Sequence, residues 1–330
     1  MTRSCGSICL PTVQSRTAID TLSRAVLLVL ALVLTAPASA AGCSALKDDD
    51  ERLACYDAAA ALQTLEETTV FTERRQGERS VWNNRFSILP HRRAYLLPLS
   101  YTPEPGKAAL DLPPGDSLQR AEVKFQYSFK VPVASGLLSE NDQLFVAFTQ
   151  LSLWQAYNQD LSSPFRETMY EPELIWTLPV SRELLGGSLN YFSVGINHQS
   201  NGRGGDYSRS WNRITVETAW ATERWAVGLR AWERIKESKD EDDNPDIEDY
   251  LGHGELAVGY KWDDFRFTAA LRNNLQRSDN RTSMEFGLSW PFNQKLSAYA
   301  QFYNGYGETL LDYDQRVRRI GIGIILADWF

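Results

Sequence analysis

The amino-acid sequence predicts an all-β protein: a transmembrane antiparallel β-barrel of about twelve strands, preceded by a short helical and irregular periplasmic segment. Three observations predict this fold class. Apolar and polar residues alternate through much of the chain, short and long links follow one another, and the last segment is amphipathic and ends in the aromatic residue Phe330. A strand places successive side chains on opposite faces, so alternation gives each strand one apolar and one polar face.

The alternation is clear in the segment 122–131, where Val123 and Phe125 alternate with Lys124 and Gln126. We count about twelve segments of this kind. They begin near residues 92, 121, 142, 166, 187, 210, 225, 252, 265, 282, 295 and 316.

The links between these segments differ in length. Asp263-Asp264 and Pro291–Gln294 are short turns, whereas the longer polar links cover 156–163, 199–210, 236–248, 272–281 and 304–315. Short turns on one side and long loops on the other are typical of an outer-membrane barrel. In the last segment Ile320, Ile322, Ile324 and Leu326 share a face, and the terminal Phe330 resembles the signal that outer-membrane assembly machinery reads.

The N-terminal part of the chain has a different pattern. Residues 25–36 form the only long apolar run, with Arg24 before it and Ala38-Ser39-Ala40 after it. This arrangement predicts a signal peptide over residues 1–40, because the run is too short for a comfortable transmembrane helix. We expect residues 41–90 to be a periplasmic segment, helical over 43–67 and irregular over 68–90, and residues 91–330 to be the barrel domain.

Export makes a disulfide possible between Cys43 and Cys55, the two cysteines that follow the predicted signal peptide. The alternative is that Cys43 is a lipoprotein acylation site, although the preceding Ala40-Ala41-Gly42 lacks the usual leucine. Two cysteines without a local histidine argue against a metal site here.

Composition excludes one class of partner. The formal net charge is −8 and the pI about 5.1, whereas a nucleic-acid-binding protein needs a basic face. Aromatic residues make up 12% of the chain, as expected where aromatic girdles meet a membrane interface.

Three polar residues fall on the apolar outer face of two neighbouring predicted strands. Counting by twos from Ile196 places His198 and Ser200 on the lipid side, and counting back from Ile214 places Asn212 there. Polar groups exposed to hydrocarbon without partners cost roughly a few kcal/mol each. Mutual hydrogen bonding is the simplest reason for their presence.

The spacing of these residues suits catalysis. His198 and Ser200 are about 6–7 Å apart along one strand, and Asn212 on the next strand is placed to orient the imidazole. A nucleophile, a base and an orienting group form a catalytic triad. The alternative is that they only meet lipid headgroups at the barrel rim. His91 and His253 lack such neighbours, so we expect structural roles for them.

At this point the sequence resembles the outer-membrane phospholipase A family. The resemblance covers residues from about 120 to 330 in consistent order. The matching segments are Asn197–Arg203, Ser208–Arg213, Ser162–Thr168, Asp242–Ile247 and Gly305–Glu308. It implies an enzyme of the bacterial outer membrane, with its active site toward the outer leaflet, that hydrolyses phospholipid acyl esters with A1, A2 and lysophospholipase activity.

The family's catalytic residues match positions in this chain. The resemblance implies that Ser200 is the nucleophile, His198 the base and Asn212 the orienting residue. It also implies that the backbone N–H of Gly202 forms the oxyanion hole, assisted by a calcium-bound water. Gln199 stands where the family commonly has aspartate, but it points into the barrel.

The resemblance further implies calcium (Ca²⁺) as cofactor and an active homodimer. The calcium ligands correspond to the Arg203 carbonyl, Ser208, and Ser162 of the partner subunit, and Asp243 corresponds to a second, weaker site. Gln150, which parity places on the lipid face, corresponds to a glutamine that pairs with its copy across the two-fold axis.

Two other functions compete with this interpretation. One is a passive or structural barrel. The charges predicted to point inward are of both signs, so they would pair and fill the lumen, which argues against an open pore. They are Lys124, Lys130, Glu217, Arg230, Glu255, Lys261, Arg266, Arg272 and Glu285. The other is a surface protease of similar barrel type, which would carry acidic residues and histidine on long loops above the membrane.

Overall fold

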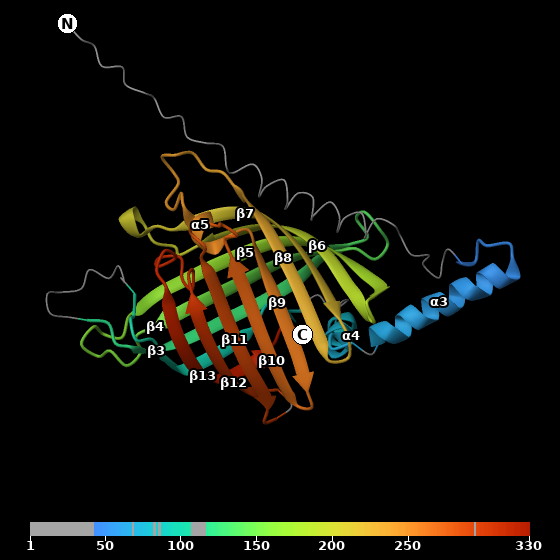
Figure 1. The fold of residues 1–330 in the computed structure, drawn as a ribbon, viewed down its shortest axis with the longest axis horizontal. Coiled ribbons are helices and arrows are strands. Elements are labelled where there is room, and N and C mark those ends of the chain that lie inside the picture. The colour runs from blue at the N-terminus through green and yellow to red at the C-terminus, as the bar shows by residue number, and fades with distance from the viewer. Residues whose placement is uncertain (1–42, 68, 82–83, 85–86, 107–116, 294) are drawn as a thin grey trace, which may run out of the picture. The chain divides into compact units, whose positions relative to one another are not determined.

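The computed structural model describes residues 43–67, 69–81, 84, 87–106, 117–293 and 295–330. The signal peptide predicted for residues 1–40 lies outside the described residues. Strands β2 to β13 form one antiparallel sheet that closes because β3 pairs with both β2 and β4 (Figure 1). A two-residue strand, β1 (Leu89–Pro90), pairs with β3 outside this ring.

The strands of the barrel begin within two residues of the predicted positions, so the predicted all-β barrel is confirmed. Their bounds are β2 Ala94–Tyr101, β3 Ala121–Ser135, β4 Gln143–Trp154, β5 Phe165–Leu184, β6 Gly187–Ser200, β7 Ser210–Ala221, β8 Trp225–Ile235, β9 Gly254–Trp262, β10 Phe265–Asn273, β11 Thr282–Pro291, β12 Ser297–Gly305 and β13 Val317–Ala327.

Short turns and long loops alternate between the strands, as the sequence predicts. Two turns have only two residues, Leu185-Gly186 between β5 and β6 and Asp263-Asp264 between β9 and β10. The first has positive φ at both residues, 52° and 73°. Two positive φ values are characteristic of the type I′ turn, whose twist suits a tight hairpin. The long loops include 201–209 between β6 and β7, with the 3₁₀ turn η1 (Gly205–Tyr207), and 236–253 between β8 and β9, with α5 (Ile247–Leu251).

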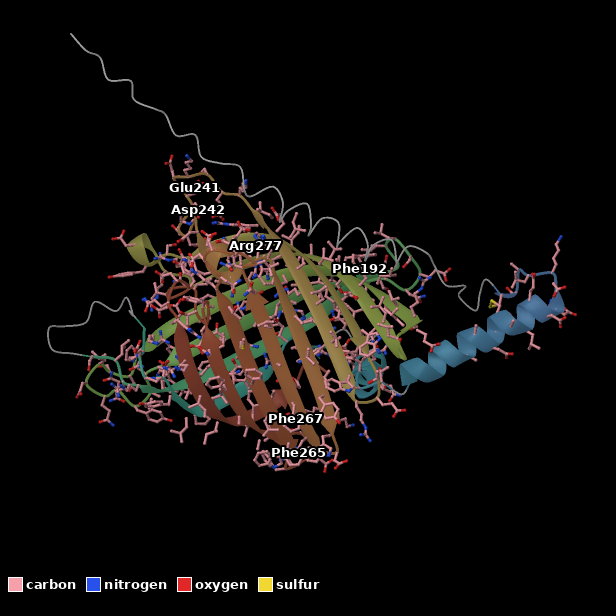
Figure 2. All side chains as sticks on the ribbon, viewed as in Figure 1. Phe192, Glu241, Asp242, Phe265, Phe267 and Arg277 are labelled. Atoms are coloured by element: carbon pink, nitrogen blue, oxygen red, sulfur yellow. A yellow bond between two sulfur atoms is a disulfide. The ribbon has the colours of Figure 1, made fainter. Side chains whose placement is uncertain are left out.

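The two ends of the barrel carry different side chains. Phe265 and Phe267 lie at the short-turn end, and Glu241 and Asp242 lie in a long loop at the opposite end (Figure 2). Trp225, Trp262 and other large aromatic residues near the short turns are also exposed on the outer wall. An aromatic girdle at one end and charged loops at the other match the orientation of an outer-membrane barrel.

Paired charges line the lumen, but they do not fill it as the sequence predicted, because a cavity of about 630 Å³ remains between them. Arg230 reaches Glu173 at 2.7 Å and Glu171 at 3.3 Å, and Arg92 donates to Glu173 at 3.2 Å. Closer to the long loops, a second set joins Glu122, Lys124, Arg166, Glu308, Asp312 and Arg319. Charges removed from water need partners of opposite sign, and this pairing supplies them.

The short-turn mouth of the barrel contains a helix that the sequence did not predict. α4 (Thr72–Val81) falls in the segment that was expected to be irregular. Its sequence TERRQGERSV has no apolar periodicity, so contacts with the barrel must stabilise it. Arg74 donates to the Trp329 carbonyl at 2.7 Å and to the Pro90 and His91 carbonyls at 2.8 Å.

The C-terminus also departs from the expectation. β13 ends at Ala327, and Phe330 is only 6% exposed, packed with Phe71 and the alanines Ala219, Ala221 and Ala226. A Cβ on Gly259 would meet the Phe330 ring at 2.4 Å. Because Gly259 faces the lumen, Phe330 points inward and does not continue the outer face of the last strand.

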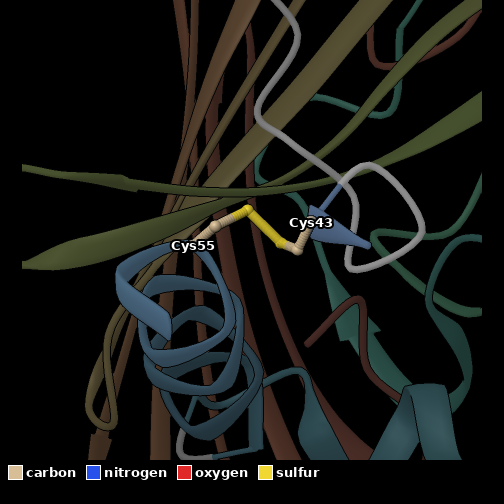
Figure 3. Close-up of a disulfide and its surroundings, with 2 residues drawn as sticks. All are labelled: Cys43 and Cys55. Carbon is tan, nitrogen blue, oxygen red and sulfur yellow. A yellow bond between two sulfur atoms is a disulfide. The ribbon is translucent and has the colours of Figure 1, made fainter. Parts of the chain in front are cut away.

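The N-terminal helix α3 (Asp49–Glu67) lies within the predicted helical segment 43–67. A disulfide joins Cys43 to Cys55, with 5.6 Å between the two Cα atoms (Figure 3). Among the described residues, no helix is both long enough and apolar enough to cross a membrane.

Candidate active site

The structure brings His198 and Asn212 together on the outer face of the barrel. The two residues are direct partners in the β6–β7 register, and His198 Nδ1 lies 2.8 Å from Asn212 Oδ1. Their neighbours Asn197 and Arg213 form the next register pair and point into the lumen, where Asn197 is fully buried. The parity that placed His198 outside and Asn197 inside is therefore seen in the contacts of both residues.

Ser200 is the last residue of β6, on the same face as His198 and at the long-loop end. Its hydroxyl makes no hydrogen bond to any residue that the structure describes. Of the two contacts that the predicted triad requires, the one between His198 and Asn212 is thus formed, and the one between His198 and the Ser200 hydroxyl is not. Catalytic hydrogen bonds are often longer without substrate and tighten when it binds.

Asn201 organises the loop after Ser200. Its side chain donates to the Tyr207 carbonyl at 2.9 Å and accepts from the backbone N–H groups of Arg203 and Arg209 at 3.2 and 3.1 Å. The N–H of Gly202, between Asn201 and Arg203, has no hydrogen bond within the described part of the chain. Gly202 has φ 65°, and a Cβ there would approach the Tyr170 ring to 3.1 Å. Glycine therefore suits a position where an open N–H must face a ligand.

The same loop contains oxygen atoms that suit a hard cation. The Ser208 hydroxyl donates to Asp243 Oδ2 at 2.5 Å, which brings a hydroxyl and a carboxylate together beside the 201–209 loop. The guanidinium of Arg203 donates to the Arg166 carbonyl at 2.5 Å, so the side chain is turned toward β5. No group of three or more His, Cys, Asp and Glu side chains suited to a metal occurs in the described ranges. A calcium ion here would depend on neutral oxygen atoms as well as Asp243.

Gln150 and Ser162 lie on the side of the barrel formed by β4 and the following loop. Gln150 is half-buried on the same face as the exposed Val146, and its amide donates to the Ser152 hydroxyl at 3.2 Å. Ser162 is exposed in the β4–β5 loop with φ 57°, held by a bond from its N–H to the Gln159 carbonyl at 3.0 Å.

The other polar residues that the sequence singled out have structural contacts. His91 Nε2 lies 2.7 Å from Glu173 inside the lumen, and His253 Nδ1 lies 3.4 Å from Glu248. Gln199 accepts a bond from the Trp211 indole at 2.9 Å, inside the barrel as expected.

One acidic residue near this site was not predicted. Glu237 Oε1 accepts a hydrogen bond from Asn212 Nδ2 at 2.7 Å. Glu237 stands two residues beyond the end of β8, in an acidic loop that contains several other carboxylates. Continuing the parity of β8 beyond Ile235 is the one signal that pointed to it.

Comparison with known proteins gives a consistent result. The family model described as Phospholipase A1 matches residues 71–326. Phospholipase A1 of Klebsiella pneumoniae is 36% identical over 249 residues, which cover 75% of this chain and 85% of that protein. Phospholipase A1 of Escherichia coli strain K12 is 35% identical over 248 residues, which cover 75% and 84%.

Solved structures agree with the barrel described above. Outer membrane phospholipase A from Escherichia coli matches with a TM-score of 0.70 at 35% identity, covering 75% of this chain and 95% of that one. An active-site mutant of that enzyme, in which asparagine is replaced by alanine, matches with a TM-score of 0.71. The outer membrane phospholipase dimer of Salmonella typhi with bound calcium matches with a TM-score of 0.70 at 35% identity, with the same coverage.

Proposed function

We propose the following reaction from the premise that this chain belongs to the phospholipase A1 family of the bacterial outer membrane. It is a phospholipase, and we infer that it hydrolyses acyl esters at both the A1 and A2 positions and those of lysophospholipids. The observation that carries the mechanism is the His198–Asn212 hydrogen bond of 2.8 Å on the lipid-facing wall, beside the Ser200 hydroxyl.

In the first half-reaction, Ser200 Oγ attacks the ester carbonyl carbon while His198 Nε2 takes the hydroxyl proton. Asn212 accepts from His198 Nδ1–H, so it holds the ring with Nε2 toward Ser200. The tetrahedral intermediate collapses, the carbon–oxygen bond to the glycerol breaks, and His198 returns the proton to the leaving alkoxide. A water molecule then repeats the sequence on the acyl-Ser200 ester and releases the fatty acid.

The N–H of Gly202 donates to the oxyanion of each intermediate. A donor aimed at developing negative charge contributes roughly 3–4 kcal/mol. The Arg203 carbonyl, Ser208 and Ser162 of the partner subunit would hold calcium, and Asp243, bonded to Ser208, would serve a second, weaker position. When bound, calcium would supply positive charge that stabilises the oxyanion. The need for Ser162 from a second copy makes the homodimer the active form.

The test is ester hydrolysis by purified, refolded protein in mixed micelles of phospholipid and detergent, with calcium and with a chelator. Ser200→Ala should abolish hydrolysis and retain native heat-modifiable gel mobility, because a small side chain on the lipid face costs the barrel little. A sulfonyl fluoride should label Ser200. Retention of more than a small residual rate by a folded Ser200→Ala protein would refute the assignment, and equal wild-type rates with and without chelator would refute calcium dependence.

A further inference from the structure

We propose that Glu237 is a positioning residue: it fixes the orientation of the Asn212 amide and, through it, the tautomer of His198. This inference rests on the proposed function, because it concerns the same base and nucleophile. It assigns a role to a residue in the β8–β9 loop, outside the barrel strands.

Three strands place the residues of this chain of contacts in line on the outer face. His198 on β6 is opposite Asn212 on β7, and Asn212 is opposite Ile235 on β8. Ile235 is 40% exposed on the outer wall. Glu237 comes two residues later, so the backbone alternation returns its side chain to the face of Ile235 and Asn212.

The hydrogen-bonding chemistry of the Glu237 carboxylate sets which group donates and which accepts in the contacts from Glu237 through Asn212 to His198. A carboxylate only accepts, so the group of Asn212 that faces Glu237 must be the NH₂, which lies 2.7 Å from Oε1. The Asn212 oxygen then faces His198 Nδ1 at 2.8 Å, and that nitrogen must carry the proton. His198 Nε2 is left with its lone pair, the form that accepts the Ser200 proton.

Without Glu237 the side-chain amide of Asn212 could flip, which would exchange the positions of its oxygen and its NH₂. An amide presents oxygen or NH₂ with nearly the same shape, so packing alone selects weakly between its two orientations. In the reversed orientation the NH₂ would face His198 Nδ1, which would favour the tautomer that is protonated on Nε2. That tautomer cannot act as the base for Ser200.

Glu237 is itself held in place. Its side chain is 18% exposed, and Arg234 Nη2 lies 3.7 Å from Oε2. Arg234 is anchored in turn by Asp242 at 2.6 Å and by the Asn244 carbonyl at 3.1 Å. Glu237 Oε2 is buried and has no hydrogen bond to the described residues. The contact with Asn212 is therefore the main hydrogen bond of this carboxylate, which fits a role at the triad better than a role as a loop anchor.

The experiment replaces Glu237 by residues that differ in the hydrogen bonds they can offer Asn212. Glutamine can accept or donate, leucine does neither, and lysine only donates. We expect kcat to fall by about tenfold in Glu237→Leu, the effect of one orienting hydrogen bond, with KM unchanged. Glu237→Gln should lie between leucine and wild type. Glu237→Lys should lie below leucine, because a donor at this position selects the reversed amide.

Two controls separate positioning from loop structure and charge. Glu241 lies in the same loop and contacts Ser238 instead of Asn212, so Glu241→Lys should retain wild-type kcat. In an Asn212→Ala background the Glu237 variants should agree within about twofold, because the group through which they act is gone.

The outcomes of this series are distinct. Wild-type kcat in both Glu237→Leu and Glu237→Lys overturns the inference, as does an undiminished loss in the Asn212→Ala background. Ser200→Ala is measured in the same assay. If it remains active, the proposed function fails; if it is inactive while the Glu237 variants are normal, only the role of Glu237 fails.

Discussion

The two faces of the β6–β7 wall contain polar groups in adjacent register positions but arrange them differently. On the inner face Arg213 donates to Asn197 at 2.9 Å, and Asn197 donates to Glu171 at 2.7 Å. One residue along each strand, on the outer face, His198 and Asn212 share a single hydrogen bond, and Ser200 is left without one among the described residues.

In the proposed mechanism, one backbone serves stability on its inner face and chemistry on its outer face. Inside, paired charges compensate each other's loss of hydration, so every member of the network depends on the others. Outside, a histidine, an amide and a hydroxyl are partly exposed, and the hydroxyl has no hydrogen bond to the described residues. Substitutions on the two faces should therefore affect different measurements, activity outside and stability inside.

The largest effect is expected on the outer face. His198→Ala should lower kcat by roughly 10²–10⁴-fold, the usual contribution of a general base. Asn212→Ala should lower it substantially but less, since Asn212 orients the ring and transfers no proton. Both proteins should keep the wild-type unfolding temperature in detergent. Equal, wild-type activity in both variants would rule out the triad.

On the inner face we expect the reverse. Arg230→Met removes the cation that reaches both Glu171 and Glu173, at 3.3 and 2.7 Å. Each carboxylate then keeps one other arginine, Arg213 or Arg92, at 3.2 Å. Breaking a buried ion pair typically costs about 3–5 kcal/mol, so the denaturant midpoint should fall while the folded fraction keeps its kcat. Arg318→Met is the matched control, because Arg318 is exposed on the outer face of β13. A similar loss of stability in both variants would contradict the comparison.

A smaller effect is expected where the outer face meets a second copy. Gln150→Ala and Ser162→Ala should each require more calcium for dimerisation in detergent, because the proposed contact and the proposed ligand are lost, and binding and assembly are linked. Analytical ultracentrifugation across a calcium titration, with hydrolysis measured on the same samples, tests this. Full activity from a monomeric species would exclude the dimer mechanism.

The smallest effect is expected on stability at low pH, where the ion pairs of Glu308 on the inner face weaken. Burial raises the pKa of the Glu308 carboxyl, but Arg319 and Lys124 outweigh burial and hold that pKa at about 2, below its ordinary 4.5. Glu308 is in the loop between β12 and β13, where Arg319 and Lys124 reach it at 2.8 and 3.0 Å. A carboxyl group whose pKa is lower in the folded than in the unfolded protein stabilises the fold at pH values above its unfolded pKa. This stability is lost as the pH falls through its folded pKa.

The wild type should therefore be more stable than Glu308→Gln at neutral pH. The difference should shrink between pH 4.5 and about 2, which the temperature of the heat-modifiable gel shift can follow. A difference that stays constant over this range would show that the Glu308 ion pairs do not contribute.

Much of this architecture could be predicted from the sequence because alternation is a local property. The two-residue alternation gives the strand starts and places His198, Ser200 and Asn212 on one face. The spacing between the alternating segments gives the lengths of the links. The same rule assigned Gln199 and Lys124 to the lumen, where they contact Trp211 and Glu308.

The missed features lie where the alternation ends. α4 has no apolar stripe, and its position depends on Arg74 contacts with residues that are up to 255 positions away in sequence. Glu237 is beyond the last hydrogen-bonded pair of β8, where the loop could turn either way. Phe330 follows the end of β13 by three residues, and the pattern of the last strand does not determine the direction of that tail.

The inward position of Phe330 has a consequence for the closed barrel. Phe330 is only 6% exposed and packs against Ala219 and Ala221 of β7 and Ala226 of β8, and Arg74 binds the carbonyl of the residue before it. In the strand order of the sheet, β7 and β8 lie on the opposite side of the ring from β13. The tail after the last strand is therefore a non-covalent cross-link between two walls that share no backbone hydrogen bonds.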